Sequence, residues 1–154
     1  MPTTRYADVP RTDKTARAFL REGRTSRKQA YEICNLIRGK PVQKAKFILL
    51  RVLDMKQAVP MRRHNGGVAH RKGQLGGWDA GRYPQKCTNA ILSLIEEAEA
   101  NAAYKGLDTD RLIIRHINSY GGRHKRWNRG SIVFGRRTRH RERAANIEVV
   151  LEER

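Results

Sequence analysis

Three stretches of the chain place apolar residues at the three- and four-residue steps of an α-helix. The first begins after Ser26 and stops before Gly39, the second begins at Pro41, and the third runs from Pro84 to Lys105. Glycine after a helix and proline at its first turn are typical end signals. The apolar positions are Ala30, Ile33, Cys34 and Ile37, then Ala45, Ile48, Leu49, Val52 and Leu53, and finally Ile91, Leu94, Ile95, Ala98 and Ala102.

Three other stretches have the pattern of β-strands. Small and apolar residues alternate with other residues from Lys14 to Leu20 and again from Ile147 to Leu151, while β-branched residues concentrate in Leu112–Ile117. Antiparallel pairing of the last two strands makes residues 111–143 one long hairpin, with arms on the order of 50 Å at ~3.3 Å per residue. The predicted fold class is therefore α+β, with three helices packed on a small antiparallel sheet and a long protruding β-hairpin.

Between Val59 and Arg82 the periodicity disappears, and glycines alternate with basic residues. A loop of this length is usually functional or disordered. Trp78 and Tyr83 lie within or beside it, and their rings can stack on unpaired bases. The alternative is that both rings fold back on the hydrophobic core.

Charge points to a partner that is rich in phosphate. The 154 residues include 33 Lys or Arg against 15 Asp or Glu, a formal net charge of +18. Eleven basic residues against one acid, Glu142, lie between Arg111 and Arg143, so the order of this tract should depend on a polyanion. A membrane surface is the competing explanation, but the chain has no long apolar run, no secretory leader and no basic helix with a wide apolar face. We therefore expect a cytosolic protein.

The residues that could carry catalysis are poorly placed for it. Cys34 and Cys87 lie inside predicted helices, which favours buried thiols without a disulfide or zinc. None of the histidines has metal-ligand spacing, and no glycine motif is of the dinucleotide or phosphate-loop type. The acids Glu96, Glu97 and Glu99 indicate a solvated helix face or a contact for a basic neighbour. No enzyme activity, metal or cofactor is predicted; the histidines are His64, His70, His116, His124 and His140.

Several local strings, in one order along nearly the whole chain, resemble a known family. They are SRKQA (Ser26–Ala30), IRGKPV (Ile37–Val42), VPMRRHNGGV (Val59–Val68), AEANA (Ala98–Ala102) and KGLD (Lys105–Asp108). The family is the universal large-subunit ribosomal protein that lines the polypeptide exit tunnel, number twenty-two in bacteria and seventeen in the eukaryotic scheme. The glycine-rich loop resembles the archaeal and eukaryotic branch, since the bacterial form goes almost directly between the two helices.

The resemblance implies a structural constituent of the large ribosomal subunit that clamps several domains of 23S-type rRNA. It implies a single domain, 1–154, whose globular part (about 12–110 and 144–154) lies near the tunnel exit, a basic loop at 59–82, and an extended hairpin at about 111–143. The tip of this hairpin lines the tunnel. The expected partners are large-subunit rRNA, neighbouring ribosomal proteins near the tunnel exit and the nascent polypeptide, with no membrane and no homo-oligomer, in the cytoplasm.

Charge and resemblance together select the candidate site residues. The rRNA-binding candidates are Arg27, Lys28, Arg62, Arg63, His64, Arg71, Lys72, Trp78, Arg82, Tyr83, Arg123, His124, Lys125, Arg126, Trp127, Arg129, Arg139, Arg141 and Arg143. The tunnel-lining tip falls at Ile132, Val133, Phe134, Gly135, Arg136 and Arg137. Two competing functions remain: a basic chromatin protein or RNA chaperone acting off the ribosome, and an RNA-modifying enzyme. The long hairpin flanked by helices with short joints suits a fixed niche better than sliding on a duplex.

Overall fold

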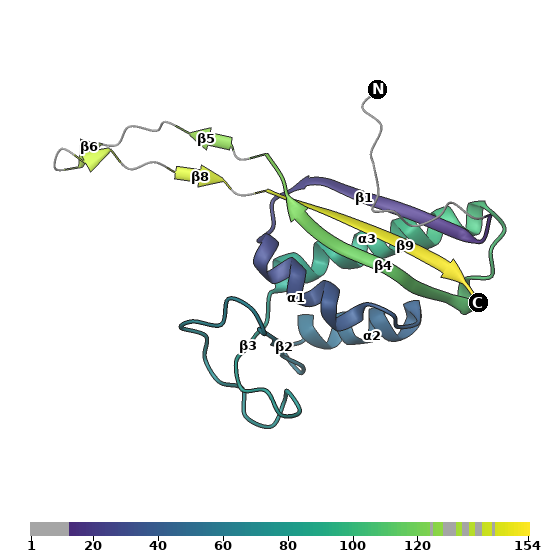
Figure 1. Cartoon of the computed structure of the whole chain (residues 1–154), viewed down its shortest axis with the longest axis horizontal. Coiled ribbons are helices and arrows are strands. Elements are labelled where there is room, and N and C mark those ends of the chain that lie inside the picture. Colours follow the sequence, from purple (N-terminus) through teal and green to yellow (C-terminus); the bar gives the residue numbers. More distant parts are fainter. Residues whose placement is uncertain (1–12, 124, 128–131, 134–135, 138–139, 143) are drawn as a thin grey trace.

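The helices of the protein pack on a three-stranded antiparallel sheet. This computed structural model describes residues 13–123, 125–127, 132–133, 136–137, 140–142 and 144–154. The sheet contains β1 (Thr15–Gly23), β4 (Leu112–Gly121) and β9 (Ala145–Glu153), in the order β1-β9-β4 (Figure 1). The last strand of the chain is therefore the central strand of the sheet, and both edge strands depend on it for their hydrogen bonds.

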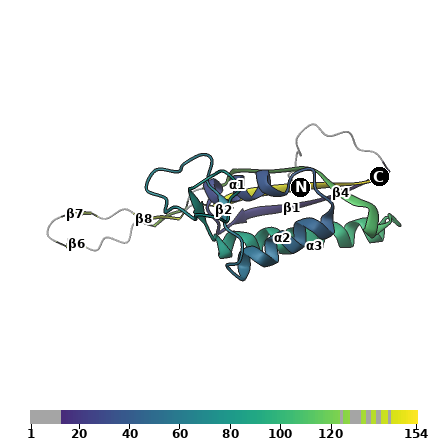
Figure 2. The ribbon, with the colours of Figure 1, turned by 90° about the horizontal axis from the view of Figure 1, so that it is seen from below.

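Three helices pack against the core face of this sheet, which confirms the predicted α+β class. They are α1 (Arg27–Ile37), α2 (Val42–Leu53) and α3 (Gln85–Tyr104). Helix α3 lies against β1 and β9, α1 lies against β4, and α2 packs mainly on α3. Alternate residues of the strands complete the core under the helices: Ala16, Ala18, Leu112, Ile114, Ile117, Ile147, Val149 and Leu151. Figure 2 shows the sheet and the helices from a perpendicular direction.

The helix ends agree with the sequence signals in part. Gly39 and Gly106, with φ of +74° and +75°, follow α1 and α3 in the left-handed conformation that glycine adopts without strain. Ser26 is the N-cap of α1, as the sequence predicts, but its side chain makes no capping hydrogen bond. A short 3-10 helix, η1 (Thr109–Arg111), connects α3 to β4.

The hairpin continues from β4 and β9 beyond the body. Its described strands are β5 (Lys125–Trp127) with β8 (His140–Glu142), and β6 (Ile132–Val133) with β7 (Arg136–Arg137), all antiparallel. These strands project from one end of the sheet, in the direction in which β4 points (Figures 1 and 2). Val133 pairs with Arg136, and both lie in the segment that the resemblance implies is the tip.

The hairpin leaves the body later than the sequence suggested. The expected boundary was residue 111, yet β4 pairs with β9 from Leu112 to Gly121 within the three-stranded sheet. The reason is burial: Leu112, Ile114 and Ile117 are 1%, 0% and 0% exposed under the helices, and withdrawing them would expose apolar surface. The part that projects from the three-stranded sheet therefore lies between Gly121 and Ala145.

The two ends of the glycine-rich loop are hydrogen-bonded to each other. The two-residue strands β2 (Val59–Pro60) and β3 (Gly81–Arg82) pair with each other, and His70 forms an isolated bridge with Ala80. Val59 is fully buried, and Val68 and Ala80 are each 9% exposed within the core cluster. The loop is thus anchored to the body at three points, which limits the conformations it can adopt.

Both thiols are buried, as predicted, and we expect them to react slowly with thiol reagents. Cys34 is fully buried and Cys87 is 2% exposed, and neither forms a disulfide. Burial raises the pKa of the Cys87 thiol from 9.0 to about 12, and it raises that of Cys34 as well, helped by the neighbouring Cys87. Because the thiolate is the nucleophile, the folded protein should react with Ellman's reagent at pH 8 at least about 100-fold more slowly than the urea-unfolded protein.

The raised thiol pKa values also make the stability of the protein depend on pH. Unfolded thiols ionise above about pH 9, whereas folded ones stay protonated until about pH 12, so the free energy of unfolding should fall as pH rises through this interval. Equal rates of reaction with Ellman's reagent for folded and unfolded protein at pH 8 would contradict the predicted protection of the thiols, and a free energy of unfolding that does not fall between about pH 9 and 12 in urea titrations would contradict the pH dependence.

Candidate nucleic-acid interface

The first turn of α1 lies at the root of the hairpin. Arg27 and Lys28 are exposed there, and the Ser119 hydroxyl of β4 donates to the Arg27 carbonyl at 3.3 Å. Gly121, the last residue of β4, is so close that an added Cβ would lie 3.4 Å from a guanidinium nitrogen of Arg27. Arg27 and Lys28, two predicted RNA-binding residues, are distant from the hairpin in sequence but lie beside the point where it leaves the body.

A buried acid fixes the basic loop to α1. The Glu32 side chain is 2% exposed, and its carboxylate accepts a hydrogen bond from the Arg63 backbone amide at 2.6 Å. The Arg63 guanidinium lies over the Tyr31 ring, 5.1 Å from its centroid, in a cation–π contact. Sequence reasoning missed both α1 residues. The available signal was a lone acid, Glu32, next to the apolar stripe of an otherwise basic segment.

The two aromatic side chains, Trp78 and Tyr83, make their polar contacts with residues of the basic loop. The Trp78 indole N–H donates to the Met61 carbonyl at 3.2 Å and leaves the ring 37% exposed. The Tyr83 hydroxyl is hydrogen-bonded to the side chain of Gln74, and the Arg71 guanidinium lies 5.2 Å from the Tyr83 ring centroid. Neither ring is buried in the core. Trp78 keeps exposed ring surface for stacking, whereas Arg71 already occupies one face of Tyr83.

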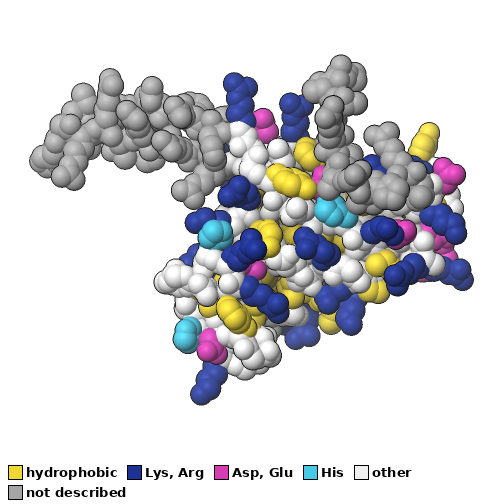
Figure 3. Space-filling model, in the orientation of Figure 1, with side chains coloured by type: hydrophobic (Ala, Val, Ile, Leu, Met, Phe, Trp, Pro, Cys, Tyr) yellow, Lys and Arg dark blue, Asp and Glu magenta, His cyan; other side chains and the backbone are white. Residues whose placement is uncertain are grey.

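Basic side chains at this end of the molecule are not neutralised by the protein. Figure 3 shows Lys and Arg side chains scattered across the described surface of one face of the molecule, with fewer acids among them. Within the described part of the chain, no carboxylate forms an ion pair with the exposed candidates. These exposed candidates are Arg27, Lys28, Arg62, Arg63, Arg71, Lys72, Arg82 and Arg123. Such unpaired cations produce a positive potential that favours a polyanion.

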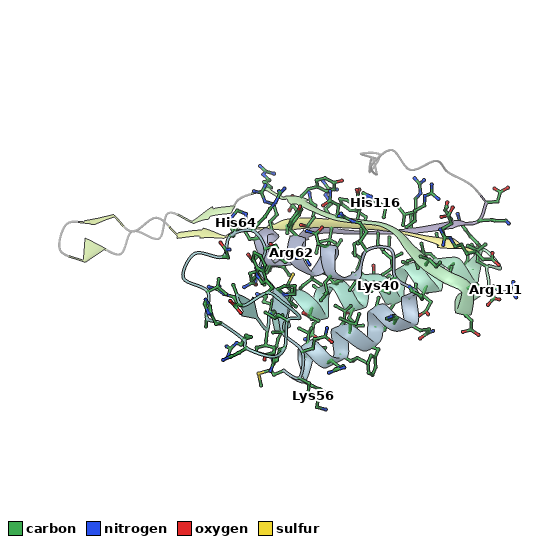
Figure 4. The ribbon with its side chains drawn as sticks, turned by 60° about the horizontal axis from the view of Figure 1, so that its bottom comes forward. Lys40, Lys56, Arg62, His64, Arg111 and His116 are labelled. Atoms are coloured by element: carbon green, nitrogen blue, oxygen red, sulfur yellow. The ribbon has the colours of Figure 1, made fainter. Side chains whose placement is uncertain are left out.

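Cations that are paired with acids lie elsewhere on the body. Arg111 of η1 pairs with Asp108 at 3.3 Å and Arg115 of β4 pairs with Glu152 at 2.6 Å, so two of the eleven charges counted for the arm belong to the body. Figure 4 shows Arg111 at the end of the body opposite the hairpin, whereas Arg62 and His64 lie on the loop toward the hairpin. Lys46 of α2 pairs with Glu99 of α3, the contact with a basic neighbour expected for that acid.

The remaining candidates lie in the hairpin. The structure gives the backbone pairing of Lys125, Arg126, Trp127, Arg141 and of the tip residues Ile132, Val133, Arg136 and Arg137. His124, Arg129, Phe134, Gly135, Arg139 and Arg143 lie outside the described residues. Since β5, β6, β7 and β8 continue from the end of the sheet where Arg27 lies, the hairpin and the basic loop leave the body at the same end (Figure 1).

His116 has a structural partner rather than a free ring. Its Nε2 lies 2.7 Å from Oε1 of Glu148, a central-strand carboxylate that is 1% exposed. The Tyr120 hydroxyl donates to the same oxygen at 2.6 Å, and burial together with this hydrogen bond raises the pKa of Tyr120. Among the described residues, no three His, Cys, Asp or Glu side chains gather as a metal site would require. No helix in the described part of the chain could span a membrane.

Fold and site together define a basic α+β protein whose described surface presents arginines and lysines without a carboxylate partner at the start of α1, on the basic loop and at Arg123 beside the hairpin root, the arrangement of a protein that binds the nucleic-acid backbone. The family described as ribosomal protein L22p/L17e matches residues 18–152. Three archaeal proteins named large ribosomal subunit protein uL22 are similar to the chain. Identity is 51% with that of Methanopyrus kandleri (92% of this chain, 89% of the relative), 44% with that of Methanocaldococcus jannaschii (99% and 97%), and 42% with that of Archaeoglobus fulgidus (100% of both).

The chain therefore belongs to the ribosomal protein L22p/L17e family, in its archaeal form. Members of this family are structural components, so the chain is not an enzyme. The same finding confirms the prediction that the chain has no enzyme activity and sets aside the alternative of an RNA-modifying enzyme.

Proposed function

We propose that the protein clamps several segments of large-subunit rRNA, with the basic loop, the start of α1 and the hairpin as its gripping surfaces. Its family makes it a structural constituent of the large ribosomal subunit, with rRNA and other ribosomal proteins as partners. One observation carries the proposal. Exposed basic side chains without a carboxylate partner, from the start of α1, from the basic loop and at Arg123 after β4, lie at the end of the body from which the hairpin projects.

The contacts would be made to phosphates and would fix position rather than read sequence. A guanidinium can bind phosphate through two parallel hydrogen bonds, which favours arginine at such points. Arg63 and Arg71 are already oriented by the rings of Tyr31 and Tyr83, so fewer rotamers are lost on binding. Trp78, with its exposed ring, is the described candidate for stacking on an unpaired base.

The hairpin is proposed to pass between rRNA domains and to line the polypeptide exit tunnel at its tip, residues 132–137. The globular body then lies near the tunnel exit, and the nascent polypeptide is the partner of the tip. A single copy fills this niche, because two chains of net charge +18 repel each other without RNA between them. The match to the family over residues 18–152 and the antiparallel pairing of β6 with β7 support this arrangement.

Sedimentation at high salt tests the assignment to the subunit. A tagged copy in a cell lysate is centrifuged through a gradient containing about 0.5 M salt, at which loosely held phosphate contacts largely dissociate. We expect stoichiometric comigration with the large subunit. Release to the top of the gradient, with recovery on bulk DNA or RNA only at low salt, would instead identify a mobile nucleic-acid binder such as a chromatin protein or RNA chaperone.

Two double substitutions separate the root of the hairpin from its tip. Arg123→Ala with Arg126→Ala should reduce incorporation into subunits, because these residues lie where the hairpin leaves the body. Arg136→Ala with Arg137→Ala should leave incorporation nearly unchanged and alter tunnel-dependent stalling of nascent chains. Incorporation is measured by quantitative mass spectrometry of purified subunits, and stalling by a translation-arrest reporter. Equal loss of incorporation in both variants would rule out the division.

A further inference from the structure

The outer face of α2 carries an apolar patch that the fold does not use. Phe47, Leu50 and Met55 are 59%, 50% and 59% exposed. Phe47 and Leu50 are three residues apart and so share one face of the helix, and Met55 follows the helix end. The other exposed large hydrophobic residues among those described are Trp78, Tyr104 and Tyr120, each of which has a polar group and lies on a different element.

Folding does not account for this outer α2 patch. The opposite face of the helix is already committed to the core through Val42, Ala45, Leu49 and Val52, each at most 1% exposed. Helix α2 lies at the outside of the helix layer, so its second apolar face is not buried against the rest of the protein. Grouped apolar side chains on a surface typically mark an interaction site.

The rim of the patch is basic and largely unpaired. The exposed Lys44 precedes Phe47 by three residues on the helix, Lys56 follows Met55, and the Arg51 guanidinium lies 5.7 Å from the Phe47 ring centroid. The acid beside it, Asp54, is already in contact with Lys56 at 3.1 Å. Lys44 and Arg51 have no carboxylate partner within the described ranges of the chain. Figure 4 shows Lys56 at the outer edge of the body.

We propose that the outer α2 patch docks an acidic amphipathic segment of a neighbouring protein of the large subunit. Apolar side chains of that segment would cover Phe47, Leu50 and Met55, and its carboxylates would pair with Lys44 and Arg51. The inference rests on the proposed function, because it needs the chain to be in the subunit. With three apolar side chains the contact belongs to the small, weak class of interfaces, and assembly on common rRNA would supply the missing avidity.

Other occupants fit the patch less well. Leu50 and Met55 offer RNA neither a donor nor an aromatic face, so an rRNA contact would leave them without a role. A second copy of the chain would bring two basic rims together. A lipid surface binds helices with a wide apolar face, whereas the main apolar face of α2 is buried against α3.

Photocrosslinking in assembled subunits identifies the occupant. The photoreactive residue p-benzoylphenylalanine replaces Leu50 in one chain and the 94% exposed Tyr104 of α3 in a control chain. Salt-washed large subunits containing each chain are irradiated, and crosslinked peptides are sequenced. We expect position 50, and not position 104, to crosslink to a protein segment in which acidic and apolar residues alternate at helical spacing. Crosslinks from position 50 to rRNA, to a second copy or to lipid would overturn the inference.

The mapped segment is then made as a synthetic peptide and titrated against the full-length chain. Leu50→Ser should weaken binding by about fivefold or more, and Arg51→Glu by about two- to fivefold. A peptide with lysines in place of its acids should bind the Arg51→Glu variant better than the unchanged chain, whereas Tyr104→Ser should have no effect. Unchanged affinity for both patch variants would contradict the proposal.

Failure of this inference can be told apart from failure of the function itself. A chain that comigrates with the large subunit at about 0.5 M salt but crosslinks from position 50 to rRNA removes the docking inference alone. A chain that does not comigrate removes both.

Discussion

Replacing Arg27, Arg62 and Lys72 together with alanine should lower the affinity for a large-subunit rRNA transcript on the order of 100-fold at ~0.1 M salt. These three side chains are exposed, come from α1 and the basic loop, and have no acid partner among the described residues. Each phosphate contact that is lost also removes a released counterion. The slope of log K against log salt should therefore become shallower by about 2 to 3. Filter binding at several salt concentrations measures both quantities.

A matched triple replacement tests whether position or net charge is responsible. Lys14→Ala, Arg111→Ala and Arg115→Ala remove the same charge from the other end of the body. There Arg111 and Arg115 pair with Asp108 and Glu152. We expect this control to lose less than about fivefold in affinity, since two of its three cations, Arg111 and Arg115, contact acids rather than phosphate. If both triples lost the same affinity, the binding would depend on overall charge and the proposed interface would be wrong.

The largest effect on stability is expected for Leu94→Ala. Leu94 is 1% exposed in the middle of α3, the helix that packs against β1, β9, α1 and α2. Truncating a buried leucine removes apolar burial and leaves a cavity, and it typically lowers the free energy of unfolding by about 2–5 kcal/mol. This is a large share of the roughly 5–15 kcal/mol that holds a typical domain together. Urea denaturation followed by circular dichroism measures the change.

Leu50→Ala provides the control, because it is the same truncation on a neighbouring helix. Leu50 is 50% exposed, so little buried surface is lost and the expected change is within about 0.5 kcal/mol. If Leu50→Ala destabilised the isolated chain as much as Leu94→Ala, the outer α2 patch would belong to the core and could not be a free docking surface.

The sequence alone determined the secondary structure and the chemical character of the partner. Helical periodicity at Ile91, Leu94 and Ile95 and alternation at Ile147 and Val149 are local properties, because each depends only on residues within one or two turns or along a single strand. Net charge is a sum over residues and needs no fold. The local strings likewise indicate the family without any knowledge of the fold.

Only the tertiary structure decided which distant residues act together. Nothing in the periodicity places the last strand, β9, at the centre of the sheet, because strand order depends on contacts between residues far apart in sequence. For the same reason the sequence did not reveal that Glu32 holds the basic loop or that Arg27 lies at the hairpin root. It also placed the start of the hairpin ten residues too early, at 111 rather than after Gly121, because burial of Leu112–Ile117 under the helices is a property of the packed core.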